Sequence, residues 1–69
     1  MNIKEFGQRV RYLRKNLGLS QEKFALSISM DRTYYADIEN GKRNLSFNNI
    51  CKIANGLGLS LSELFKEEF

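Results

Sequence analysis

The sequence of 69 residues has no proline, no histidine and no tryptophan, and it has one cysteine, Cys51. Without histidine there is no imidazole for acid–base chemistry at neutral pH, and a single cysteine cannot form a disulfide within the chain. No apolar run approaches the roughly 20 residues of a membrane span, and the first residues lack the apolar stretch of a signal peptide. We therefore expect a cytoplasmic chain with no membrane partner, no metal and no cofactor.

The patterns that indicate an enzyme are missing as well. The sequence shows no nucleophile–base pair, no paired catalytic carboxylates and no glycine-rich loop of the kind that cradles phosphates. Its length corresponds to one small domain spanning residues 1–69, and a chain of this size buries only about 60% of its unfolded surface. Because no covalent crosslink is available, self-association is a natural supplement to the core. We predict a single, non-enzymatic domain.

The charge of the sequence is distributed unevenly. The net charge is only +3, which does not by itself identify a nucleic-acid ligand. Residues 1–46 hold nine basic and five acidic residues, a balance of +4, whereas residues 47–69 hold two basic and three acidic residues, a balance of −1. The basic residues of the first two-thirds form either the solvated faces of helices or a surface for a polyanion.

Apolar residues recur at helical spacing between residues that favour helix ends. Ile3, Phe6, Val10, Leu13 and Leu17 follow one another at intervals of three and four, the period of one helix face. Serine, aspartate and asparagine are favoured at the start of a helix, and glycine directly after its end. The sequence therefore predicts an all-α fold. The five expected helices are capped by Asn2, Ser20, Asp31, Ser46 and Ser60, and the first four end near Gly18, Ser29, Asn40 and Gly58.

The segment from residue 20 to residue 41 has the layout of a helix-turn-helix. A two-turn helix is followed by a short turn and a longer helix, which can enter the major groove of DNA. On a helical wheel of about 100° per residue, Tyr35, Ile38 and Glu39 fall on one side, which we assign to the core. The opposite side is short, polar and varied, as a face that reads base edges requires. It carries Arg32, Thr33, Asp37 and Asn40, with Tyr34 on its flank.

Two stretches of this segment resemble a known family. Residues 20–25 read SQEKFA and residues 31–43 read DRTYYADIENGKR. They are similar to the Cro/CI-like (XRE) helix-turn-helix family, and most of all to the controller proteins of restriction-modification systems. The resemblance extends over nearly the whole chain and implies a compact five-helix domain. It also implies a homodimeric repressor or activator that binds a near-palindromic operator in double-stranded DNA.

The resemblance also implies roles for single residues. Arg32 and Thr33 are expected to contact bases, and Tyr34 the DNA backbone or a flexible base step. Two positions depart from the family pattern: Ser29 stands where the turn usually has glycine, and Tyr35 where a branched aliphatic residue is usual. Phosphate contacts are expected from Gln21, Asn40, Lys42 and Arg43, with Arg43 also able to reach a base, and a buried ion pair is expected between Arg14 and Glu39.

Three questions stay open at the level of sequence. Asp37 accepts a hydrogen bond from a cytosine, repels the wrong DNA sequences, or pairs with a nearby basic side chain. The context is either a restriction-modification system, with contact to RNA polymerase where activation occurs, or that of a phage-type repressor or an antitoxin with the same fold. The C-terminal helices, about residues 47–69, carry more apolar residues than one small helix can bury, so we expect the dimer interface there. Its predicted contacts are Leu61, Leu64, Phe65 and Phe69.

Overall fold

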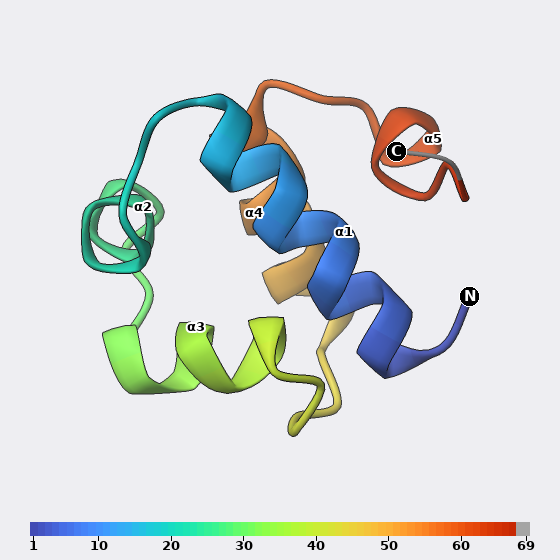
Figure 1. Cartoon of the computed structure of the whole chain (residues 1–69), viewed down its shortest axis with the longest axis horizontal. Coiled ribbons are helices and arrows are strands. Elements are labelled where there is room, and N and C mark those ends of the chain that lie inside the picture. Colours follow the sequence, from blue (N-terminus) through green and yellow to red (C-terminus); the bar gives the residue numbers. More distant parts are fainter. Residues whose placement is uncertain (68–69) are drawn as a thin grey trace.

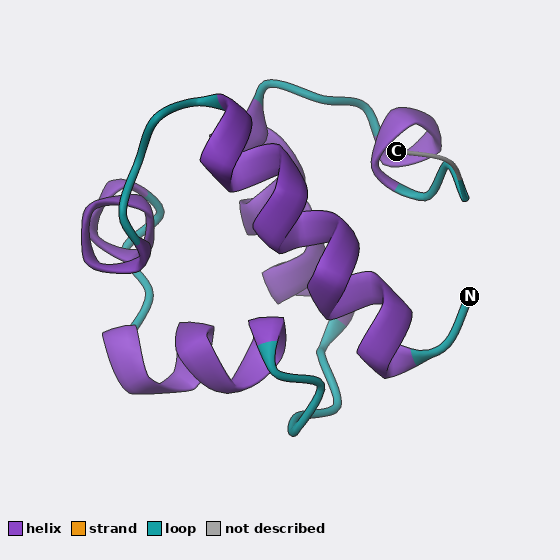
Figure 2. Cartoon of the chain, in the orientation of Figure 1, coloured by secondary structure: helices purple, strands orange, loops and turns teal. Residues whose placement is uncertain are grey.

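The computed structural model describes residues 1–67 as helices joined by short connections. No strand occurs within these residues, as Figure 2 shows. The predicted all-α fold of five helices is therefore confirmed. The helices are α1 (Ile3–Asn16), α2 (Gln21–Ser27), α3 (Arg32–Glu39), α4 (Phe47–Leu57) and α5 (Leu61–Leu64) (Figure 1).

Each helix begins directly after the polar residue predicted to cap it. The side chain of each cap accepts a hydrogen bond from the backbone N–H three residues later. At α1 and α5 the pairing is reciprocal, because the carboxylate of Glu5 or Glu63 accepts a hydrogen bond from the backbone N–H of the cap. Such a cap contributes about 1 kcal/mol, which is a large share for helices as short as α2 and α5. The caps are Asn2, Ser20, Asp31, Ser46 and Ser60.

The turn between α2 and α3 contains a residue in the left-handed conformation. Ser29 has a φ of 55°, and it is the non-glycine residue with positive φ among residues 1–67. A side chain in this conformation costs roughly 1–2 kcal/mol, whereas glycine adopts it freely. Ser29 therefore adopts the left-handed backbone conformation that glycine, the usual residue of this turn in the family, adopts at lower cost.

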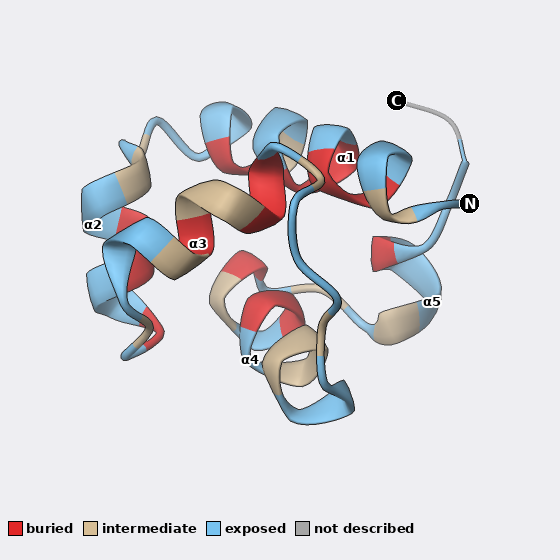
Figure 3. Ribbon diagram, turned by 90° about the horizontal axis from the view of Figure 1, so that it is seen from below, coloured by how far each residue is buried: buried red, intermediate tan, exposed pale blue. Residues whose placement is uncertain are grey.

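The core lies between α1, α3 and α4, whose buried segments face one another in Figure 3. α1 packs against α3 and α4, α2 packs against α3, and α5 packs against α4. Leu17 was predicted on the buried face but is 49% exposed, because α1 ends at Asn16 and Leu17 already belongs to the connection. All five helices contribute to the core, which consists of Phe6, Val10, Phe24, Ala25, Ile28, Tyr35, Ile38, Ile53, Ala54, Leu57 and Leu64.

A glycine allows α1 and α3 to approach each other closely. A Cβ atom at Gly7 would lie 2.4 Å from the carbonyl oxygen of Ile38 and 2.6 Å from that of Glu39. These distances are far below a van der Waals contact, and the obstructing atoms are backbone. Gly7 therefore sets the separation between α1 and the C-terminal half of α3.

The structure corrects the assignment of Leu64 to a surface. Its side chain is fully buried within its own chain, where it completes the core. Arg9 explains this position: its Nε donates to the carbonyl oxygen of Leu64 at 3.3 Å, and its Nη2 donates to that of Glu63 at 2.9 Å. The guanidinium satisfies carbonyls at the end of α5 and holds this short helix against α1. Leu64 therefore cannot contact a second chain without unfolding its own.

The other predicted contacts of the C-terminal segment have different positions. Phe65 is 42% exposed, and its ring stacks on that of Phe6 at 5.4 Å between centroids. Leu61 is half-buried beside the core. Phe69 lies outside the described residues. None of the helices in residues 1–67 combines the length and the apolar character needed to cross a membrane.

Candidate nucleic-acid interface

The helix-turn-helix predicted from the sequence is formed by α2, residues 28–31 and α3. α3, which we call the recognition helix, has one buried side and one accessible side. Tyr35, Ile38 and Glu39 are buried, as the helical wheel predicted. Arg32 and Thr33 are exposed at the start of the helix. The side chains expected to touch bases therefore lie on the accessible side.

A buried ion pair fixes the inward side of the recognition helix. Arg14 of α1 donates from Nε to Glu39 Oε2 at 2.7 Å and from Nη2 to Oε1 at 3.0 Å, so the buried ion pair that the resemblance implied is formed by two hydrogen bonds. Its Nη1 also donates to the carbonyl oxygen of Leu19 at 2.7 Å. One guanidinium thus connects α1, the connection before α2 and the recognition helix. Such paired geometry is specific in direction as well as strong.

Two further side chains complete this buried network. The hydroxyl of Tyr35 donates to Glu39 Oε2, and the amide of Gln21 donates to Oε1 at 2.9 Å. Burial raises the pKa of Glu39, but the hydrogen bonds from Arg14, Gln21 and Tyr35 outweigh burial, so the pKa lies below its ordinary value of 4.5. Burial and the bond to Glu39 raise the pKa of Tyr35. The network therefore contains a charged carboxylate and a neutral phenol at neutral pH.

The network changes the interpretation of two residues. Tyr35 departs from the aliphatic residue usual in the family, and its hydroxyl has a partner in Glu39. Gln21, expected to hold a phosphate, uses one of its two amide hydrogens on Glu39. The second amide hydrogen remains for another acceptor. Gln21 therefore links the start of α2 to the recognition helix before any ligand is bound.

The accessible side of the recognition helix has a different kind of ion pair. Arg32 Nη1 lies 3.8 Å from Glu22 Oε1, and the two side chains are 67% and 69% exposed. An exposed pair at this separation contributes little to stability, in the range of about 0–1 kcal/mol. The guanidinium of Arg32 is therefore free to exchange this carboxylate for a ligand at little cost.

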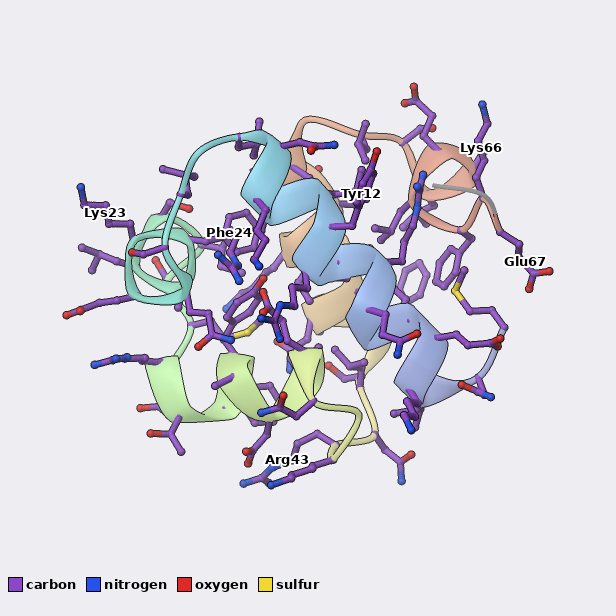
Figure 4. The ribbon with its side chains drawn as sticks, viewed as in Figure 1. Tyr12, Lys23, Phe24, Arg43, Lys66 and Glu67 are labelled. Carbon is purple, nitrogen blue, oxygen red and sulfur yellow. The ribbon has the colours of Figure 1, made fainter. Side chains whose placement is uncertain are left out.

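The loop that follows the recognition helix adds basic groups to the same side. Asn40 and Lys42 are exposed, and Arg43 Nε lies 3.4 Å from Asp37 Oδ2. Figure 4 shows the Arg43 side chain below α3, at the edge of the molecule away from Lys66. Asp37 thus has the local basic partner that was one of the alternatives left open by the sequence. The start and the end of the recognition helix both present cationic groups.

Tyr34 lies between the core and the accessible side. Its ring is half-buried, with the guanidinium carbon of Arg43 5.2 Å from the ring centroid. Its hydroxyl accepts a hydrogen bond from Asn49 Nδ2 at 3.1 Å. Tyr34 therefore connects the accessible side of α3 to the start of α4, a contact that the sequence did not predict.

The exposed basic groups are fewer than the sequence count suggested. Arg9 and Arg14 are buried and serve the structure, and Arg9 was not predicted to do so. The spacing contained a signal, because Arg9 follows Phe6 by three residues and precedes Leu13 by four, which places it at the edge of the apolar face. The basic residues of the first two-thirds that remain exposed are Lys4, Arg11, Lys15, Lys23, Arg32, Lys42 and Arg43.

No metal site accompanies these groups in the part of the chain that the structure describes. No cluster of three or more histidine, cysteine, aspartate or glutamate side chains occurs in residues 1–67. Cys51 of α4 is a free, half-buried thiol. Beside its basic groups, the accessible side carries the carboxylates of Glu22 and Asp37, each paired with an arginine.

Comparisons with known proteins agree with this geometry. The helix-turn-helix family model HTH_3 matches residues 10–64, which include α2, α3, α4 and α5 in full. Control protein C.MunI of Mycoplasma sp is 57% identical over 63 residues, covering 90% of this chain and 85% of that protein. Control protein C.BamHI of Bacillus amyloliquefaciens is 47% identical over 60 residues, covering 86% of this chain and 74% of that protein.

A solved structure is similar over almost its full length. The restriction-modification controller protein C.AhdI from Aeromonas hydrophila superposes with a TM-score of 0.88 at 46% identity, covering 91% of this chain and 96% of the other. Both the arrangement of helices and the helix-turn-helix sequence therefore point to one group of regulators and to no enzyme. The chain belongs to the Cro/CI-like (XRE) helix-turn-helix family of DNA-binding transcriptional regulators, and restriction-modification control proteins are among its close homologues.

Proposed function

We propose that this protein is a homodimeric controller of a restriction-modification system that binds a near-palindromic operator. The observation that carries the proposal is the accessible side of the recognition helix. It presents Arg32 and Thr33 at its start and Lys42 and Arg43 beyond its end, on a helix fixed by the buried Arg14–Glu39 pair. The similarity to control proteins supplies the biological context.

The proposed mechanism divides positioning from reading. In a symmetric dimer, two recognition helices enter successive major grooves about 34–36 Å apart on one side of the duplex. Contacts from Gln21, Asn40 and Lys42 to phosphates provide affinity through counterion release, which makes binding sensitive to salt. Arg32 and Thr33 distinguish base pairs, and Tyr34 contacts the backbone or a flexible base step.

We place the dimer interface in the C-terminal segment, with the contacts revised by the structure. Phe65 is exposed and Leu61 half-buried, and the half-buried Ile50 of α4 lines the same surface hollow as Phe65. Leu64 is removed from the interface because it is a core residue. Covering apolar surface of this kind is what a two-fold contact achieves.

The position of the operator determines the direction of regulation in this proposal. A dimer bound across a promoter represses transcription, whereas a dimer bound directly upstream recruits RNA polymerase. The alternative context of a phage repressor has one supporting observation: the immunity repressor protein of Bacillus phage phi105 is 36% identical over 62 residues. This chain covers 43% of that repressor, compared with 85% of C.MunI, and the proportion favours the controller assignment.

The experiment is a binding selection from random duplexes combined with sedimentation. We expect a consensus with two inverted half-sites and a sedimenting species of two chains. In sedimentation, Phe65→Glu should weaken self-association, while Leu26→Glu on the exposed surface of α2 is the matched control with the same charge. A consensus without inverted symmetry, or a wild-type chain that stays monomeric both free and on the selected duplex, would contradict the proposal.

A further inference from the structure

The side chains around Asp37 form a connected group on the accessible side of the recognition helix. Asp37 Oδ2 lies 3.4 Å from Arg43 Nε, Arg43 lies over the ring of Tyr34, and Asn49 donates to the Tyr34 hydroxyl. These four residues come from the recognition helix, the loop after it and the start of α4. The Asp37 carboxylate and the Tyr34 ring therefore contact the guanidinium of Arg43 from two directions.

A loop arginine without such contacts is a flexible cation. It then binds phosphates in many orientations, which adds affinity for any DNA sequence. Reading a guanine requires the guanidinium plane to be held so that two N–H groups meet two acceptors together. Asp37 constrains one edge of the Arg43 guanidinium, and the Tyr34 ring faces it at 5.2 Å from the centroid. These two contacts restrict the orientation of the Arg43 guanidinium, so its remaining N–H groups point in defined directions.

The charge of Asp37 has a second effect. A free carboxylate on a face that approaches DNA repels phosphates, and this repulsion acts at every DNA sequence. When Asp37 is paired with Arg43, the pair is nearly neutral at long range. The arginine can then contribute close contact with a base edge without adding strongly to sequence-independent affinity.

We propose that Asp37 is a positioning residue that orients Arg43 for a base contact, with Tyr34 and Asn49 supporting the same orientation, and that Asp37 reads no base itself. This inference rests on the proposed function, because it requires the accessible side of the recognition helix to meet DNA. It assigns base recognition at one operator position to Arg43 of the loop, and the orientation of that arginine to Asp37 of the helix.

The test is a double-mutant cycle read as base preference at each operator position. The variants are Asp37→Asn, Arg43→Gln and the two together. Asp31→Asn is the matched control, because it removes the same charge from the N-cap of the recognition helix, and asparagine can still accept the capping hydrogen bond from the Tyr34 backbone N–H. Each protein is selected against random duplexes, and its affinities for the operator and for a non-operator duplex are measured at one salt concentration.

We expect Asp37→Asn and Arg43→Gln to lose preference at the same position of each half-site. Both Asp37→Asn and Asp31→Asn should bind non-operator DNA more tightly than the wild type, but only Asp37→Asn should lose operator preference. The ratio of operator to non-operator affinity should fall about tenfold in Asp37→Asn, the size of one good base contact. In the Arg43→Gln background the same substitution at position 37 should leave the base preference unchanged.

Three results would overturn the inference. Asp37→Asn could alter preference at a position that Arg43→Gln leaves intact, which would make Asp37 a reader. It could retain its effect on base preference in the Arg43→Gln background, or it could match Asp31→Asn in every measurement. If wild-type protein shows no preferred duplex at all, the proposed function fails together with the inference, whereas the three preceding results leave the proposed function in place.

A second measurement covers the case in which Asp37→Asn perturbs the helix. Arg43→Lys leaves α3 unaltered and keeps the positive charge, but it removes the planar fork that a bidentate contact needs. We expect Arg43→Lys to lose the base preference while its non-operator affinity stays within about twofold of wild type. Retention of the full base preference by Arg43→Lys would contradict the orienting role.

Discussion

Each side of the recognition helix has an ion pair between an arginine and a glutamate, but the two pairs have different roles. On the inward side, Arg14 and Glu39 form two short hydrogen bonds in a buried setting, and Gln21 and Tyr35 complete the network. On the accessible side, the pair formed by Arg32 and Glu22 is 3.8 Å apart and exposed. The inward pair fixes where the helix lies, whereas the outward pair leaves its arginine available.

This difference shows why a count of charges says little about such a domain. A buried pair that loses one partner leaves an uncompensated charge, with a large penalty in stability. An exposed pair that loses one partner changes stability little, but the freed group changes what the surface can bind. The net charge of +3 does not distinguish the two cases.

The largest expected effect comes from breaking the inward pair. Glu39→Gln removes the carboxylate opposite the buried Arg14 and should lower the free energy of unfolding by about 3 kcal/mol, measured by urea denaturation. Glu22→Gln makes the same chemical change in the exposed pair and should alter it by less than about 0.5 kcal/mol. Equal effects of the two substitutions would refute the contrast between the two sides.

The acid stability of the protein follows from the same pair. The pKa of Glu39 is lower in the folded chain than its ordinary value of 4.5, so the unfolded chain takes up a proton at higher pH than the folded chain does. The stabilisation is complete above about pH 4.5 and is lost as the pH falls through the lower folded value. The difference in unfolding free energy between wild type and Glu39→Gln should therefore shrink below pH 4.5. A difference that stays constant down to pH 2 would contradict this assignment.

The next effect concerns the accessible side. Arg32→Ala should relax preference at one base position in each half-site, with a loss of about 1–3 kcal/mol in discrimination. Because Arg32 is exposed, the free energy of unfolding should stay within about 0.5 kcal/mol of the wild type. Binding selection and urea denaturation of the same preparation separate the two quantities. An unchanged base preference would remove Arg32 from the readout.

The smallest expected effect tests whether the free energy of unfolding can be raised without changing the base preference. Ser29 is exposed and has a positive φ, so Ser29→Gly should relieve backbone strain and raise the free energy of unfolding by about 1 kcal/mol. Its base preference should match the wild type, because Ser29 is not among the side chains proposed to contact DNA. A stabilised variant with an altered preference would show that the turn also positions the readout.

Most of the fold could be predicted from the sequence, because the sequence patterns that mark helix ends and buried helix faces are local. Each capping residue acts within three positions of itself, and Tyr35, Ile38 and Glu39 share one side of a single helix. The Arg14–Glu39 pair followed from the family resemblance. The roles of Arg9, Asn49 and Gly7 were not predicted, since each depends on a backbone or side chain far away in the sequence.

The error at Leu64 has the same origin. A short C-terminal helix with several apolar residues can cover its own core or the surface of a second chain, and the sequence pattern of the two is identical. The guanidinium of Arg9 decides between them, because it binds the carbonyls of Glu63 and Leu64 and draws the helix inward. Arg9 had been counted among the basic residues of the surface.

The close approach at Gly7 has a mechanical consequence. At Gly7 the carbonyl groups of Ile38 and Glu39 lie directly on α1, with no side chain at this point that could change rotamer. The distance from each recognition helix to the rest of its own domain is therefore not adjustable by repacking. In the proposed dimer, a change in the separation of the two recognition helices therefore has to come from the interface between the two chains. Where an operator does not match that separation, either this interface shifts or the duplex bends or twists.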